Sequence, residues 1–270
     1  MPRAKKQVIH CFELIILNPM KIAVSGKGGS GKTVFCACLG KVLSRNQIVY
    51  MIDADPDGNL GLTLEFDEEE LKKIKPICEL KELIKERTQQ DSLGFFLLNP
   101  EVSDMPEKYS LKKGNIYLLV LGVVKKADTG CYCPENVFLK SLISSLILDK
   151  KEAVIIDLPA GVEVLTRGTA KNVDYLYILT EPTIKSIQTA QHIEKLAIEL
   201  KIPKIVFVGN KISSEHDINF INQQLKNKMN KYICFDSSLK DFEQKKISLE
   251  QTSFYQQIKN EFHKICSETN

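Results

Sequence analysis

The chain has 270 residues, of which 43% are apolar, so it can bury a large core and a single domain is the leading expectation. Its net charge is +3, from 37 basic and 34 acidic residues, which gives no support to nucleic acid or an anionic membrane as the main partner. No apolar run reaches the roughly 18 residues that a membrane-spanning helix needs. We therefore expect a cytoplasmic protein without a membrane span.

Residues 1–19 precede the first predicted strand and form an N-terminal extension. Its basic start is followed by an apolar stretch that His10 and Glu13 interrupt, which makes a poor secretory signal. Because Met20 stands directly before the first strand, we hypothesise that translation begins there. The domain itself is expected to span residues 20–270.

A glycine-rich loop joins a predicted strand at 20–25 to a predicted helix at 33–44. The loop meets the pattern G-x-x-x-x-G-K-[ST] with Gly26, Gly31, Lys32 and Thr33, and its flanking strand and helix are those that a phosphate-binding loop requires. Lys32 is expected to neutralise the β and γ phosphates of a nucleotide, and the Thr33 hydroxyl to bind magnesium. The predicted nucleotide-binding residues of this loop are Gly26, Gly28, Gly29, Ser30, Gly31, Lys32 and Thr33.

Carboxylates follow two of the next predicted strands. The second strand ends at Asp53, and Asp55 and Asp57 come just after it. A later apolar strand at 153–156 ends at Asp157, in the form expected of a carboxylate that holds a magnesium-bound water. Ligands bind at the carboxyl edge of a parallel sheet, and a magnesium ion bound to nucleotide would compensate the repulsion between these charges.

The remaining elements predict an α/β fold. Residues 68–90 read as two short amphipathic helices with a break at Pro76. Strands at 116–120, 175–180 and 204–208 alternate with helical stretches such as 184–200, whereas 213–230 are polar and weakly helical. We predict a single-domain, three-layer P-loop fold, in which helices cover both faces of a mostly parallel sheet.

Cys131 and Cys133 lie in a loop that runs into a predicted helix at 136–148, with Pro134 suited to its first turn. Side chains two apart in extended chain share a side, so both thiols can face one ion. One chain supplies only two thiolates, whereas closed sites for zinc-like ions want four ligands, so a site shared between two copies would complete the set. On spacing alone, chance occurrence of so short a motif stays an alternative.

The chain resembles the deviant phosphate-loop ATPases, which include the septum-site and plasmid-partitioning ATPases and the nitrogenase iron protein. Lys27 and the run at 53–59 carry this resemblance. It implies an ATP hydrolase in which Lys27 reaches across a homodimer to the partner's nucleotide and neutralises transition-state charge. It also implies that Asp55 orients the attacking water.

The same resemblance assigns the rest of the nucleotide site. Asp53 and Asp157 would lie around the magnesium ion. Asn210, after the strand at 204–208, matches the asparagine that contacts adenine in this group, with Lys211 beside it.

Within that group the chain is most similar to the CooC family, the carbon monoxide dehydrogenase accessory ATPases that insert nickel. The likeness extends over almost everything from Met20 onward and rests on the segments 53–57, 130–136, 167–170 and 209–211. It implies that the Cys131 and Cys133 pairs of a homodimer hold one metal ion, nickel or zinc, and that carbon monoxide dehydrogenase is the client. Thiolates bind several soft metals well, so affinity alone does not select nickel.

One departure keeps alternatives open. After Asp157 the family usually has methionine, glutamate and then Ala-Gly, whereas this chain has Leu158, Pro159, Ala160 and Gly161, as in the septum-site relatives. One alternative is therefore an ATP-dependent dimerisation switch that carries no metal. Another keeps the metal and changes the client to acetyl-coenzyme A synthase.

Overall fold

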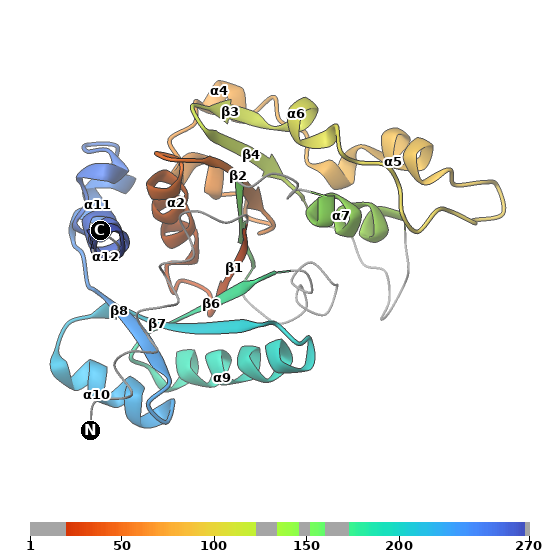
Figure 1. The fold of residues 1–270 in the computed structure, drawn as a ribbon. Coiled ribbons are helices and arrows are strands. Elements are labelled where there is room, and N and C mark those ends of the chain that lie inside the picture. The colour runs from red at the N-terminus through yellow and green to blue at the C-terminus, as the bar shows by residue number, and fades with distance from the viewer. Residues whose placement is uncertain (1–19, 123–133, 146–151, 160–172, 268–270) are drawn as a thin grey trace.

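A single sheet forms the centre of the molecule in the computed structural model, which describes residues 20–122, 134–145, 152–159 and 173–267 (Figure 1). Its strands are β1 (Met20–Gly26), β2 (Ile48–Asp53), β3 (Leu111–Lys113), β4 (Ile116–Val120), β5 (Glu152–Asp157), β6 (Tyr175–Thr180), β7 (Lys204–Ile212) and β8 (Met229–Cys234). They lie in the order β3-β4-β2-β5-β1-β6-β7-β8. Only β3 and β4 pair antiparallel; every other neighbouring pair among these strands is parallel.

Helices cover both faces of this sheet. They are α2 (Lys32–Leu43), α3 (Leu60–Thr63), α4 (Glu68–Leu71), α5 (Lys81–Thr88), α6 (Met105–Tyr109), α7 (Pro134–Ser145), α9 (Ile184–Glu199), α10 (Glu215–Gln224), α11 (Ser238–Glu243) and α12 (Ser253–Ser267), with 3-10 turns η1 (Ile77–Glu79) and η2 (Leu249–Gln251). The helices α2, α3 and α12 share one apolar core with the sheet, and α5, α6, α7, α9 and α10 share another. Figure 1 shows these as the two outer layers. The predicted three-layer α/β fold is confirmed.

The two cores explain why the central strands read as continuous apolar runs. All residues of β1 are buried, and its side chains alternate, with Ile22 and Val24 in the core beneath α2 and Ala23 in the opposite core. A strand buried on both faces cannot alternate apolar with polar residues. The apolar runs that predicted β1, β5 and β6 therefore follow from their central places in the sheet.

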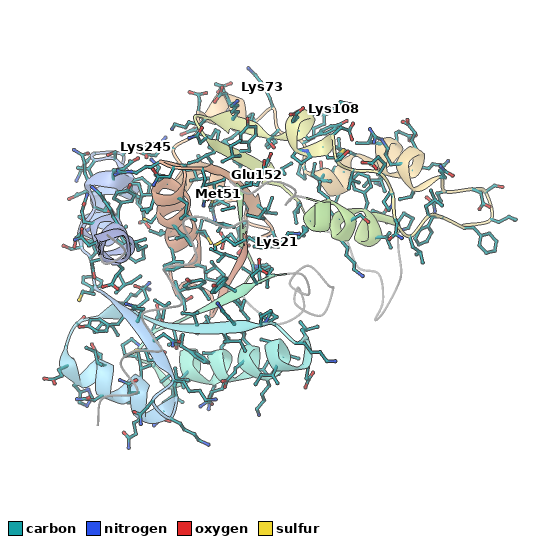
Figure 2. The ribbon with its side chains drawn as sticks, in the orientation of Figure 1. Lys21, Met51, Lys73, Lys108, Glu152 and Lys245 are labelled. Carbon is teal, nitrogen blue, oxygen red and sulfur yellow. The ribbon has the colours of Figure 1, made fainter. Side chains whose placement is uncertain are left out.

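Helix α2 lies unusually close to the sheet at Gly40. A Cβ atom on Gly40 would lie 2.4 Å from the sulfur of Met51, which is fully buried on β2. Figure 2 shows Met51 in the interior, whereas Lys73, Lys108 and Lys245 lie on the outer surface. The absence of a side chain at Gly40 thus leaves room for the Met51 side chain between α2 and the sheet.

The described elements that were not predicted from the sequence include the strands β3 and β8 and the helices α3, α6 and α11. The stretch at 213–230, expected to be weakly helical, contains α10 and the start of β8, and the stretch at 68–90 forms α4, η1 and α5. Among the residues that the structure describes, no helix is both long and apolar enough to cross a membrane.

Candidate nucleotide site

The glycine-rich loop lies at the carboxyl end of β1, between β5 and β6. Gly26 adopts φ +154°, and a Cβ there would meet the Leu179 carbonyl oxygen of β6 at 2.4 Å. Gly31 adopts φ +89°, and a Cβ there would meet the Asn210 amide nitrogen at 2.5 Å. Both positions therefore require glycine, because a side chain would push the loop away from its neighbours.

Helix α2 begins at Lys32 directly after this loop. Gly31 is the N-cap residue of the helix and makes no side-chain hydrogen bond. The N–H groups of the first turn therefore have no acceptor from the N-cap side chain. Such a helix start favours phosphate, which accepts hydrogen bonds from free N–H groups and is attracted by the helix dipole. Lys32 is only 6% exposed, so its charge is held at the loop.

Asp53 and Asp157 lie side by side at the ends of β2 and β5, where they are paired in register. Both residues are fully buried. Asp53 accepts hydrogen bonds from the N–H groups of Asp55 at 3.2 Å and Leu60 at 3.0 Å. Neither carboxylate oxygen of Asp157 accepts a hydrogen bond of normal geometry from the described residues.

Burial raises the pKa of Asp53 to about 7, and the nearby charge of Asp157 adds to this rise. Burial likewise raises the pKa of Asp157 to about 6, although the Thr33 hydroxyl and the Lys32 ammonium act in the opposite direction. Buried carboxylate oxygens without a donor are costly unless a cation balances them. Because Mg²⁺ prefers oxygen ligands, the donor set of Thr33, Asp53 and Asp157 fits this ion.

Asp55 is half-buried and begins a tight turn after β2. Its carboxylate accepts a hydrogen bond from the N–H of Asp57 at 3.1 Å, and its carbonyl accepts one from Gly58 at 3.1 Å. The turn fixes the backbone of Asp55 next to the buried Asp53. Its predicted role toward water stays a prediction.

Asn210 and Lys211 reach the glycine-rich loop from β7. The Asn210 amide donates to the carbonyl of Ser30 at 2.8 Å, and its oxygen accepts from the N–H of Lys211 at 2.8 Å. The Lys211 ammonium donates to the carbonyl of Gly29 at 2.8 Å. The structure thus brings both residues to the predicted site, in contact with the loop; the adenine contact predicted for Asn210 stays a prediction.

Glu181 belongs to this group and was missed by sequence reasoning. It follows β6 and forms an ion pair of 2.5 Å with Lys211. Its position directly after a buried strand, at the carboxyl edge of the sheet, was the signal that could have found it.

Lys27 stands at the turn of the loop, where its carbonyl accepts a hydrogen bond from the N–H of Ser30 at 3.1 Å. Its side chain is half-buried and makes no hydrogen bond or ion pair with the described part of the chain. Its neighbours Gly28 and Gly29 are exposed. Within the described residues the Lys27 ammonium is therefore unpaired.

The predicted metal ligands Cys131 and Cys133 lie outside the described residues, as do the extension at 1–19 and the segment at 160–172. Helix α7, which was predicted to follow the cysteines, begins at Pro134 and buries Phe138, Leu139 and Leu142. Elsewhere, in the described ranges, no three His, Cys, Asp or Glu side chains are grouped so as to hold a metal ion.

Comparisons with known sequences identify the family of the chain. Residues 21–249 match the family model of the CobQ/CobB/MinD/ParA nucleotide binding domain. The chain is 42% identical over 205 residues to the carbon monoxide dehydrogenase accessory protein CooC of Rhodospirillum rubrum, covering 75% of this chain and 78% of that protein. It is 40% identical over 200 residues to an uncharacterised ATP-binding protein of Methanocaldococcus jannaschii, covering 73% of this chain and 76% of that one.

Solved structures share the fold. The MinD cell division protein of Aquifex aeolicus superimposes with a TM-score of 0.65 at 19% identity, covering 92% of this chain and 97% of that one. A plasmid partition protein of Borrelia burgdorferi bound to AMPPNP gives a TM-score of 0.66 at 16% identity, covering 93% of this chain and 100% of that one. At such low identities these likenesses bear on the fold alone.

Proposed function

The chain belongs to the CobQ/CobB/MinD/ParA nucleotide-binding family and within it to the group of CooC, and we propose that this ATPase couples ATP hydrolysis to nickel insertion into carbon monoxide dehydrogenase. The observation that carries the proposal is the 42% identity to a carbon monoxide dehydrogenase accessory protein over three quarters of the chain. The Cys131-x-Cys133 motif supports it from the chemistry of the residues, because two thiolates suit a soft metal ion.

In the proposed reaction a water molecule attacks the γ phosphorus of ATP while the bond to the bridging oxygen of ADP breaks. Asp55 orients the water, and the water proton leaves with the phosphate. The backbone N–H groups of the loop and Lys32 hold the phosphates, and Thr33, Asp53 and Asp157 would hold magnesium. When bound, magnesium neutralises charge on the phosphate oxygens.

The buried carboxyls predict how pH affects the magnesium-dependent part of nucleotide binding. With pKa values raised to about 7 for Asp53 and about 6 for Asp157, protons compete with magnesium near neutral pH. As pH falls from 7.5 to 6, we expect magnesium to enhance ADP affinity about tenfold less. Calorimetric titration of ADP with magnesium and with EDTA at each pH measures this enhancement. An enhancement that stays constant or grows as pH falls would contradict the assignment.

Metal binding is proposed to involve two copies of the chain. The cysteine pairs of a homodimer would supply four thiolates to one nickel ion, with zinc as the alternative occupant. Lys27 would act on the partner's nucleotide in the same dimer. Nucleotide state and metal occupancy would then be linked, because both favour the closed pair.

Reconstitution of the client tests the proposal directly. We expect nickel-free carbon monoxide dehydrogenase to gain activity when it receives nickel-loaded protein with ATP, at least tenfold more than with a non-hydrolysable ATP analogue. Free nickel at the same concentration is the control. Equal activation in all three mixtures would remove the insertion role. Acetyl-coenzyme A synthase, tested in parallel, decides between the two clients.

A switch without metal is the second candidate, and the Leu158-Pro159 sequence after Asp157 favours it. Leu158 itself is fully buried in the core. This candidate predicts nucleotide-dependent dimerisation that is unaffected by loss of the cysteines.

A further inference from the structure

Lys211 connects three separate parts of the nucleotide site. Its ammonium donates to the Gly29 carbonyl of the glycine-rich loop at 2.8 Å and pairs with the Glu181 carboxylate at 2.5 Å. The first partner follows β1, the second follows β6, and Lys211 itself lies in β7. Its backbone adopts φ +59°, a left-handed conformation that is uncommon for a residue with a side chain.

Asn210, the residue before Lys211, binds the next peptide group of the glycine-rich loop. Asn210, which is 2% exposed, donates to the Ser30 carbonyl at 2.8 Å. Two consecutive loop carbonyls are therefore held by two consecutive residues of β7. In a trans peptide the C=O and the following N–H point in opposite directions, so drawing the Ser30 carbonyl toward Asn210 turns the Gly31 N–H away from it.

Glu181 is a fixed anchor for the lysine. Its own N–H donates to the Ser186 hydroxyl at 2.9 Å, and Ser186 is fully buried near the start of α9. The Glu181 side chain is 14% exposed, whereas that of Lys211 is 46% exposed. The more buried carboxylate thus orients the more exposed ammonium toward the loop.

We propose that Lys211 and Glu181 are positioning residues that hold the phosphate-binding loop in the shape that accepts nucleotide. Lys211 does this as a charged donor to the Gly29 carbonyl, and Glu181 does it by orienting Lys211. The pair acts through the loop on the phosphates and makes no use of the base. This inference concerns the ATPase activity and is independent of the proposed metal and client.

The substitution Lys211→Met removes the donor and keeps much of the side-chain volume. A hydrogen bond from a charged donor stabilises by about one to two powers of ten, so we expect KM for ATP to rise about tenfold. Because the loop binds phosphates in both the ground and transition states, kcat should change less than about threefold. The matched control is Lys228→Met, which breaks an ion pair of 2.6 Å with Glu194 at nearly the same exposures, 50% and 17%. It should leave KM unchanged.

A charge exchange separates loop positioning from a merely structural ion pair. The double variant Glu181→Lys with Lys211→Glu restores the opposite charges, but a carboxylate at 211 cannot donate to the Gly29 carbonyl. We expect its KM to stay as high as that of Lys211→Met. Lys211→Arg, which can still donate, should return KM to within about threefold of the natural protein. The milder Glu181→Gln should raise KM by about threefold, and it provides the test if Lys211→Met fails to fold.

Three results would overturn the proposal. The first is an unchanged KM in Lys211→Met, and the second is a KM restored by the charge exchange. The third is a loss of affinity that depends on the base: Lys211→Met should weaken binding of ADP and inosine diphosphate by the same factor, and a loss confined to ADP would make Lys211 a base contact.

Discussion

Replacing Lys27 by alanine is expected to lower the rate of ATP hydrolysis by about a thousandfold while ATP still binds. The loop N–H groups and Lys32, which hold the phosphates in the proposed mechanism, do not depend on the Lys27 side chain. That side chain has no partner among the described residues and stands beside the exposed Gly28 and Gly29. The proposed action of Lys27 on the partner's nucleotide requires such an unpaired side chain. Steady-state hydrolysis and ATP titration measure the two properties separately.

The same variant should also lose ATP-driven dimerisation, which light scattering at fixed protein concentration can follow. A suitable control is Lys72→Ala, which removes an exposed lysine paired with Glu69 on the surface and should leave both hydrolysis and dimerisation unaffected. If Lys27→Ala hydrolyses ATP and forms dimers as the natural protein does, Lys27 has no role in trans.

Double substitution of Cys131 and Cys133 by alanine is expected to remove one metal ion per dimer. Loss of every thiolate at a shared site should weaken nickel binding by more than about a hundredfold, since even changes to residues behind metal ligands cost 10- to 100-fold. ATP binding should persist, because the glycine-rich loop, Asn210 and Lys211 are built from other segments. Metal analysis after equilibrium dialysis, with and without ATP, gives the stoichiometry.

The matched control for the cysteines is Cys234→Ala, since Cys234 is an exposed free thiol on β8. Its loss should leave the metal content unchanged. An unaltered metal stoichiometry in the Cys131 and Cys133 variant would remove the metal-carrier function. Dimerisation that persists in that variant at its natural strength would favour the switch without metal.

The central part of the fold could be predicted because its strands are buried on both faces. Strands β4 and β6 fall at the predicted residues, and β1 and β5 extend theirs by one or two. Edge strands show a weaker apolar pattern in the sequence. In β8 only Ile233 is buried, and β3 has no buried residue, so neither shows an apolar run. Their pairing with a neighbouring strand, rather than their composition, makes them strands.

The sequence predicted most of the residues of the nucleotide site, but not the hydrogen bonds and the ion pair that join them. The loop pattern and the carboxylates after β2 and β5 identified residues that the fold brings to one edge of the sheet. The sequence did not predict that Asn210 and Lys211 bind loop carbonyls, because those bonds join residues 180 and 182 positions apart. It also did not predict that Glu181 anchors Lys211, because these two residues follow or lie in different strands. Only the order of the strands brings them together.

Because Gly40 packs against Met51, the residues that α2 tolerates at position 40 depend on how close the helix lies to the sheet. Gly40 lies about 12 Å along the helix from Lys32, given a rise of about 1.5 Å per residue. A larger residue at 40 has to displace the Met51 side chain or lift the far end of α2, and lifting a rigid helix tilts the end that carries Lys32 and Thr33. A random mutational screen for lost ATPase activity should therefore recover changes at Gly40 as well as in the loop.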